Sequence, residues 1–208
     1  MYARCQLCVT LSIFLGVFMG ANDTDSKPLI AGNDPRQFEL VGIGPDAIRI
    51  EAGEISVTGR PIGYFATKES YHNYVLTFEW RYERPKDLVS EAAFQGNSGL
   101  LLHLETPHKV WPKSIEAQLF HPDAGHLFAI QGAKFQGEKD AAAQKRALKP
   151  VGEWNQQTVV CRDRAITCEI NGIEVSRGKD AVPDHGFIGW QSEGTPVRFR
   201  SLKIRKLN

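Results

Sequence analysis

The sequence is poor in the features that mark membrane-spanning, nucleic-acid-binding and disulfide-rich proteins. Its longest uncharged apolar stretch, residues 7–19, covers 13 residues, whereas a helix needs roughly 20 residues to cross a bilayer. The net charge is +1 and no basic stripe carries interleaved aromatic residues, so no nucleic-acid partner is expected. Cysteine accounts for only 4 of the 208 residues. The hydrophobic share of 42% and the charged share of 24% instead fit one globular domain with a packed core.

Familiar catalytic and cofactor motifs are also missing. The sequence contains no G-x-S-x-G nucleophile elbow, no glycine-rich phosphate loop and no H-E-x-x-H metal motif. The six histidines are scattered, so a metal site built on histidines would have to assemble from distant strands. We therefore predict no cofactor and assign no metal ligands, while a divalent metal remains an open option.

The first 21 residues have the layout of a removable export signal. Arg4 gives the start one positive charge, the apolar stretch follows, and the small residues Gly20 and Ala21 precede the polar segment NDTDSKP. We expect a signal peptide over residues 1–21, export to the periplasm or the cell exterior, and no stable membrane span after signal removal. An uncleaved membrane anchor is the alternative. Residues 22–35 are then expected to form a flexible segment.

Two cysteines remain after signal removal. Cys161 and Cys168 flank a polar turn in VVCRDRAITCEING, and a turn centred on Arg164 and Ala165 would place them opposite each other. Export would permit a disulfide between them, although cross-strand geometry is often strained. Two buried free thiols are the alternative.

Short runs of alternating apolar and polar residues, separated by Gly, Pro, Asn and Asp, dominate the remaining sequence. They predict about thirteen strands, enough for an all-β, two-sheet antiparallel sandwich with little helix. Only residues 137–149 have a helical composition, and because they lack an apolar stripe we expect an exposed loop with at most about one helical turn. No linker divides residues 36–208, which are expected to form one domain.

The last predicted strand changes its alternation. Val197 and Phe199 share one parity, whereas Leu202 and Ile204 share the other. A bulge near residues 200–201 would bring both pairs to the same face.

Polar residues with a common parity lie on three neighbouring predicted strands. Glu116 and Gln118 share a face with Phe120, about 7 Å apart along the strand. Asn97 and His103 share a parity in NSGLLLHLE. An acid, an amide and an aromatic ring together suit the binding of sugar hydroxyls and ring faces, and the acid can also transfer a proton. A solvated outer face is the alternative explanation.

Further candidates lie nearby in the sequence. Glu79 and Arg81 share the polar face of YVLTFEWRY, and Trp111 and Lys113 directly precede the Glu116 strand, where a loop could close over a ligand. Trp190 and Gln191 alternate across their sheet, and of the two we expect Gln191 to face the site.

Trp154 in GEWN and the pair Asn171-Gly172 are expected instead to serve a strand entry and a tight turn.

The segments YVLTFEWRY, NSGLLLHL, KVWPKSIEAQL, GEWN, INGIEV and GFIGWQSEGTPVRFRSLKIRKL occur in an order that resembles the 3-keto-disaccharide hydrolase domain family. The resemblance covers roughly residues 36–207, and KVWPKSIEAQ is similar to one branch of that family. It implies a concanavalin A-like, laminin G-like jelly roll of two antiparallel sheets.

The resemblance also implies action on glycosides that are oxidised at C3. A ketone at C3 acidifies the hydrogen on C2, so a base can remove it, the C1 substituent is expelled by elimination, and water then adds back. Such a reaction needs a base near C2, hydrogen-bond donors around the C3 oxygen and a proton source for the leaving group. The family's Glu-x-Gln falls on Glu116 and Gln118, its Asn-Ser-Gly on residues 97–99, and its early Glu and Arg on Glu79 and Arg81.

Two positions depart from the family pattern. Many relatives carry Arg where this chain has His103, and Asp where this chain has His121. These changes would alter the substrate, exchange one acid/base set for another, or leave a binding domain without activity.

The expected catalytic residues are Glu116, as general acid/base, and His103. The expected substrate-binding residues are Gln118, Asn97, Glu79, Arg81, Trp111, Lys113, His121 and Gln191. The leading hypothesis is an exported enzyme that cleaves 3-keto-glycosides, with a small carbohydrate or glycoside as its partner. A non-catalytic carbohydrate-binding module or lectin is the main alternative because one fold hosts both functions. A cell-envelope interaction domain without a sugar site is the third.

Overall fold

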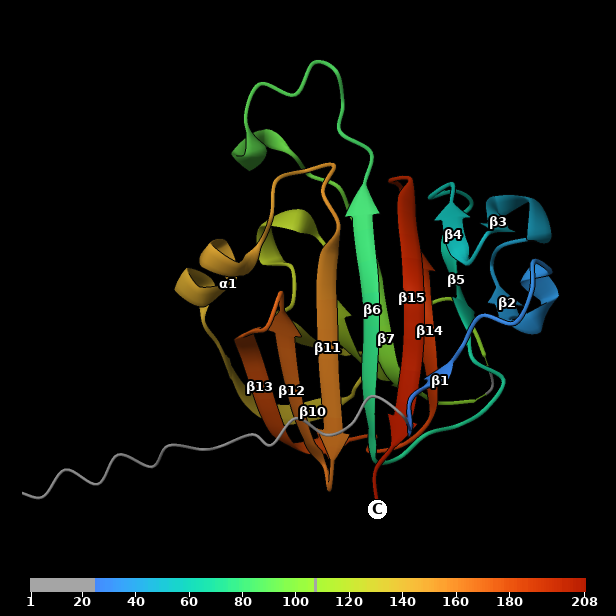
Figure 1. Cartoon of the computed structure of the whole chain (residues 1–208). Helices are drawn as coiled ribbons and strands as arrows, with labels where there is room; N and C mark the ends of the chain where they lie inside the picture. Colours follow the sequence, from blue (N-terminus) through green and yellow to red (C-terminus); the bar gives the residue numbers. More distant parts are fainter. Residues whose placement is uncertain (1–24, 107) are drawn as a thin grey trace, which may run out of the picture.

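The computed structural model describes residues 25–106 and 108–208, and the predicted signal peptide lies outside the described residues. The chain forms two stacked antiparallel sheets, which confirms the predicted all-β sandwich with little helix (Figure 1). The larger sheet has the order β10-β13-β12-β11-β6-β15-β4-β3, with β1 paired to β15, and the smaller has the order β2-β5-β14-β7-β8-β9.

The strands of the larger sheet are β1 (Lys27–Pro28), β3 (Ile48–Glu51), β4 (Glu54–Val57), β6 (Tyr74–Tyr82), β10 (Lys134–Lys139), β11 (Asn155–Arg162), β12 (Ala165–Ile170), β13 (Ile173–Val182) and β15 (Val197–Lys206). Those of the smaller sheet are β2 (Glu39–Val41), β5 (Gly63–Ala66), β7 (Gly99–Leu104), β8 (Ser114–Gln118), β9 (Leu127–Ile130) and β14 (Phe187–Ser192). The helices are the short 3-10 turns η2 (Pro35–Gln37), η3 (Pro45–Ala47), η4 (Glu91–Ala93) and η5 (His121–Asp123), and α1 (Ala141–Ala147).

The core fills the space between the two sheets and is rich in aromatic rings. The alternation along β6 buries every second residue, from Tyr74 to Tyr82. Trp190 of the smaller sheet stacks on Phe65, with ring centroids 5.3 Å apart, and meets Phe78 of the larger sheet edge-on at 6.0 Å. Burial of each such side chain contributes about 1.5–3 kcal/mol. This packing fixes which face of each strand points outward.

Turns and bulges hold these strands in register. The bulge predicted in β15 is confirmed: the register with β6 shifts between Arg200 and Lys203, and Ser201 has a φ of 55°. Asn171 and Gly172 both have positive φ in the two-residue turn between β12 and β13. This is the tight turn that the sequence predicts.

Helix α1 is longer than the single turn expected from the sequence. Asp140 caps it by accepting a hydrogen bond from the Ala143 backbone N–H at 2.8 Å, and Ala143 and Ala147 are buried. Small alanines four residues apart therefore supply the buried stripe, which a search for large apolar residues overlooks.

The start of the described chain is bound to the larger sheet. Lys27 and Pro28 pair with β15, and the Leu29 N–H donates to the Leu202 carbonyl at 2.9 Å. The expectation of a flexible segment over residues 22–35 is therefore wrong for this part, because main-chain hydrogen bonds hold it.

The two cysteines do not pair. The turn between β11 and β12 is centred on Asp163 and Arg164, so Cys161 lies opposite Ile166 and Cys168 lies opposite Val159. Both thiols are free and buried, and burial raises the pKa of each to about 12. The expected register is therefore wrong, and two buried free thiols are the observed state.

Candidate active site

Glu116 lies on the outer face of the smaller sheet, where the alternation of β8 places it. Its neighbours Ile115 and Ala117 are part of the main core, so the Glu116 side chain points to the opposite side. The residue is nevertheless only 5% exposed, and its Oε1 atom accepts no hydrogen bond from the described residues. A buried, unpartnered acceptor is energetically costly, so this position is unusual for a structural glutamate.

Gln191 and Gly99 complete the immediate surroundings of Glu116. A Cβ atom on Gly99 would lie 2.1 Å from Oε1 of Glu116 and 2.3 Å from Oε1 of Gln191. Both oxygens therefore occupy the space above the Gly99 backbone. Gln191 is 2% exposed, and its Oε1 also lacks a partner within the described residues. The expectation that Gln191 rather than Trp190 lies on this face is met, because Trp190 packs into the core.

Burial dominates the electrostatics of Glu116. It raises the pKa of the carboxyl group to about 7, repulsion from Glu193 raises it further, and the Gln191 amide opposes the rise. Glu193 follows the end of β14 and is partly buried, which raises its own pKa. Near neutral pH, Glu116 therefore exchanges between its protonated and ionised forms. That behaviour suits proton transfer.

Asn97 lies two residues before β7, and Gln118 is the last residue of β8. Asn97 is half-buried, its backbone N–H donates to Thr195 Oγ1 at 3.1 Å, and its side-chain Oδ1 lacks a partner within the described part of the chain. Gln118 pairs with Gly99 across the strands, but its Oε1 accepts from the Leu119 and Phe120 N–H groups at 2.9 and 2.7 Å. Only the amide nitrogen of Gln118 is therefore free to meet a ligand. We call Glu116, Gln191, Glu193, Asn97 and Gly99 the Glu116 cluster.

His103 lies away from this cluster. A bulge between β7 and β14 and a φ of 58° at His103 break the alternation that placed it beside Leu101. Its ring meets Tyr74 edge-on at 5.8 Å and its Nδ1 lies 3.1 Å from the Pro183 carbonyl oxygen. Burial lowers the pKa of His103 to about 4. The expectation that His103 lies on the same sheet face as Glu116 is wrong, so the geometry does not support a catalytic role for His103 beside Glu116.

Glu79 and Arg81 also lie elsewhere, on the outer face of the larger sheet. Glu79 pairs with Arg200 at 2.9 Å. The guanidinium groups of Arg81 and Arg200 both lie over the Trp154 ring, 4.9 and 4.1 Å from its centroid. The sandwich core separates this surface from Glu116. The structure therefore does not bring these two residues into the Glu116 cluster.

Trp111 and Lys113 belong to the segment before β8. Trp111 is half-buried and packs beside Tyr64 and Leu101 on the outer face of the smaller sheet. Lys113 forms an ion pair with Glu105 at 2.9 Å. Trp111 thus lies on the same sheet face as Glu116, whereas the Lys113 charge is already paired.

His121 lies beyond β8, in η5, under helix α1. Its ring meets Phe94 edge-on at 5.4 Å, and the Gln144 amide donates to its carbonyl oxygen at 3.4 Å. Its surroundings therefore form a separate cleft rather than part of the Glu116 cluster.

The cluster presents acceptor oxygens that lack donors. Hydroxyl groups of a ligand would supply those donors, and a buried carboxyl group with a pKa about 7 could exchange a proton with them. Within residues 25–106 and 108–208, no group of three or more His, Cys, Asp or Glu side chains is arranged to hold a metal ion. Among the same residues no helix is long and apolar enough to cross a membrane.

Sequence reasoning missed Glu193. The alternation through GFIGWQSEG puts Glu193 on the face of Gln191, so the signal was present. This signal was easy to overlook because Glu193 lies past the last apolar position of the strand, in a Ser-Glu-Gly segment whose composition is typical of a turn.

Comparisons with known proteins agree with this architecture. A protein from Parabacteroides distasonis that is provisionally named a glycosyl hydrolase superimposes with a TM-score of 0.63, at 21% identity over 89% of this chain and 95% of that one. The carbohydrate-binding module CBM66 from Bacillus subtilis gives 0.57 at 8% identity, over 82% of this chain and 96% of that one. A galectin-like protein of unknown function from the same organism gives 0.58 at 13% identity, over 87% and 94%.

These likenesses confirm the jelly-roll type of fold. No match was found among curated protein sequences. The model of the 3-keto-alpha-glucoside-1,2-lyase-like domain matches residues 24–205, nearly the whole described chain. The chain therefore belongs to the 3-keto-alpha-glucoside-1,2-lyase-like domain family.

Proposed function

We propose that the protein cleaves glycosides oxidised at C3, with Glu116 as the group that transfers protons. The main support for this proposal is that the Glu116 carboxyl group is buried, has a pKa of about 7 and has one oxygen without a partner above Gly99. A general acid/base works best when its pKa is close to the operating pH. Family membership supports the substrate class.

The reaction would run as an elimination followed by hydration. Glu116 in its ionised form takes the proton from C2 of the 3-keto sugar, the C1–O bond breaks, and the departing oxygen takes up a proton. Water then adds its hydroxyl group to C1 while C2 regains a proton. The free sugar and the released alcohol together contain the atoms of the glycoside plus one water.

Glu193 is the second carboxyl group available for these proton transfers. It is partly buried, forms no ion pair or hydrogen bond with the described residues, and lies close enough to Glu116 to raise its pKa. Two carboxyl groups with different degrees of burial suit one acid and one base role. Asn97 and Gln191 would orient the sugar hydroxyls through their unpartnered oxygens.

A specific experiment tests this chemistry. The purified protein is incubated in D2O with a 3-keto disaccharide and, separately, with the unmodified disaccharide. We expect cleavage of the 3-keto substrate only, with deuterium at C2 of the product sugar, because the elimination removes that hydrogen. Incubations of substrate and product without protein control for spontaneous exchange. Cleavage with protium retained at C2 would refute the elimination.

A non-catalytic carbohydrate-binding domain is the second candidate. The observation that favours it is the position of His103 in the core side of β7, which leaves the Glu116 cluster without a histidine. Binding of 3-keto or ordinary disaccharides, with no cleavage at any pH from 5 to 9, would support it. Export through the N-terminal segment also stays a proposal, and sequencing the N-terminus of the protein secreted by its host tests it.

A further inference from the structure

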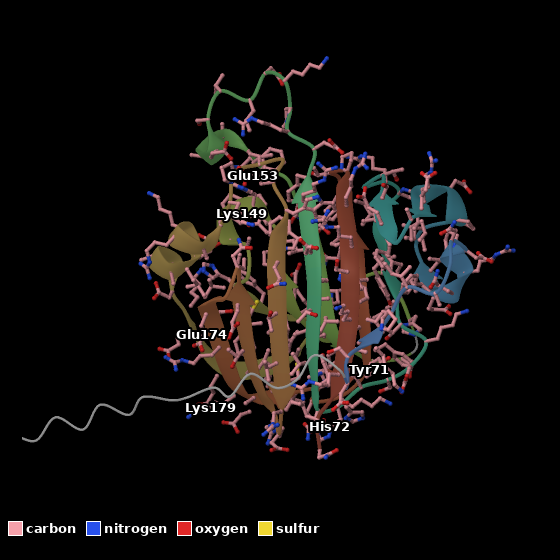
Figure 2. The ribbon with its side chains drawn as sticks, viewed as in Figure 1. Tyr71, His72, Lys149, Glu153, Glu174 and Lys179 are labelled. Carbon is pink, nitrogen blue, oxygen red and sulfur yellow. The ribbon has the colours of Figure 1, made fainter. Side chains whose placement is uncertain are left out.

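A cleft of about 520 Å³ lies beneath helix α1, on the side of the sandwich that carries the short helices η4 and η5. Its walls come from η4, η5, α1 and the segment after α1, and they include His121, Gln144, Lys145, Leu148 and Lys149. In Figure 1, α1 lies at the left side of the sandwich, and Figure 2 labels Lys149, which follows the end of α1. The volume falls within the range of small-molecule sites. None of the lining residues belongs to the Glu116 cluster.

The cleft contains a buried polar side chain that lacks a partner. His121 is 7% exposed, and its Nε2 atom makes no hydrogen bond with any described residue. Burial lowers the pKa of His121, so the ring is neutral at physiological pH and offers one N–H donor and one acceptor. Gln144 beside it is 6% exposed. His121 lines the cleft, so a ligand that reaches its covered Nε2 atom would supply the missing partner.

The charges around the cleft favour an anion. The negative charge of Glu91 is compensated by Arg84, which donates a hydrogen bond to the carboxylate, and the Val151 N–H donates a second one. Lys145 and Lys149 are exposed at the rim, and neither has a carboxylate within ion-pair distance among the described residues. Lys149 uses one of its donors on the Trp154 carbonyl oxygen at 3.0 Å. The rim is therefore cationic.

The remaining walls are apolar. Pro122, Leu148 and Pro150, with two alanines, present carbon surface to the cleft. Such surfaces suit the C–H faces of a ring, while His121 and Gln144 suit its hydroxyl groups.

We propose that this cleft is a second ligand site, which takes a small sugar acid whose carboxylate lies at the lysine rim and whose ring lies against the apolar walls. The site is independent of the chemistry proposed for Glu116.

The experiment is an amide-resolved NMR titration of the full chain with glucuronate and with glucose, which lacks the carboxylate. We expect glucuronate to shift signals in α1 and η5 and to bind roughly three- to tenfold more tightly than glucose, since ion pairs with exposed lysines are individually weak. Equal binding of the two sugars, no binding of either, or shifts confined to the Glu116 cluster would overturn the proposal. Inorganic phosphate that binds as tightly as glucuronate would also overturn it, because the ring would then contribute nothing.

Matched variants sharpen the result. Lys145→Gln should weaken glucuronate binding several-fold, whereas Lys179→Gln, an exposed lysine of β13 outside the cleft that Figure 2 also labels, should not. His121→Asn should weaken glucuronate and glucose alike, because it alters the hydrogen bonds to the ring. Glu116→Gln should leave glucuronate binding unchanged. An equal effect of the two lysine substitutions would show a general charge effect and refute the site.

Discussion

Replacing Glu116 with glutamine should change how the stability of the protein depends on pH. The pKa of Glu116 rises from 4.5 in the unfolded chain to about 7 in the folded protein. Between these two values the folded state holds a proton that the unfolded chain has already lost. The contribution of Glu116 to the free energy of unfolding of the wild type therefore falls as the pH rises through this window.

The size of the effect follows from the shift. At about 1.4 kcal/mol per pKa unit, the rise to about 7 corresponds to a loss of roughly 3 kcal/mol between pH 4.5 and pH 8. The side chain is 5% exposed, so solvent screening reduces this value little. Glu116→Gln cannot ionise and lacks this loss.

Urea unfolding of both proteins at several pH values measures the difference. We expect the free energy of Glu116→Gln, minus that of the wild type, to increase by about 3 kcal/mol from pH 4.5 to pH 8. The subtraction cancels the contributions of the titrating groups that do not interact with Glu116. Glu153→Gln, the same change at an exposed position labelled in Figure 2, is the control and should show a flat difference. If the difference for Glu116→Gln also did not change with pH, the inference that the Glu116 carboxyl group is buried with a raised pKa would be refuted.

Three further predictions concern other positions. Gly99→Ala should lower kcat/KM for a 3-keto disaccharide by roughly a hundredfold, because its Cβ would displace the Glu116 and Gln191 oxygens; unchanged kinetics in a folded variant would contradict the arrangement. Arg81→Ala should lower the free energy of unfolding by about 1 kcal/mol, because the contact with Trp154 is lost. It should leave kcat and KM unchanged, since Arg81 lies on the other sheet. A large fall in kcat would show that Arg81 takes part in the active site after all. The pKa of His103 falls from 6.5 to about 4 on folding, so the contribution of His103 to wild-type stability should fall as the pH drops through this range. His103→Gln should lack that fall in urea unfolding, and an identical pH dependence would show that the ring is not buried in its neutral form.

The fold was predictable because its signals are local. Alternation fixed which side of β6 and β8 faces the core, and the change of parity after Phe199 located the bulge in β15. The buried alanines of α1 are too small to register as an apolar stripe, so the helix was underestimated.

The candidate site was harder to predict. Alternation indicates on which face of its strand a residue lies, but it does not indicate to which sheet the strand belongs or where in that sheet the residue lies. Glu79 has the same outward parity as Glu116 and lies on the opposite surface of the sandwich. A single bulge moved His103 to the core side. The turn between β11 and β12 likewise begins one residue earlier than expected, which separates Cys161 from Cys168. Registers and bulges of this kind depend on packing between distant segments.

Glu116 is proposed to transfer the protons in cleavage of a 3-keto glycoside. The most direct measurement compares turnover and binding of a 3-keto disaccharide by the wild type and by Glu116→Gln at pH 7. We expect the variant to bind the disaccharide about as well as the wild type does and to lose roughly 10²–10⁴-fold in kcat. Wild-type kcat in a correctly folded Glu116→Gln variant would contradict it.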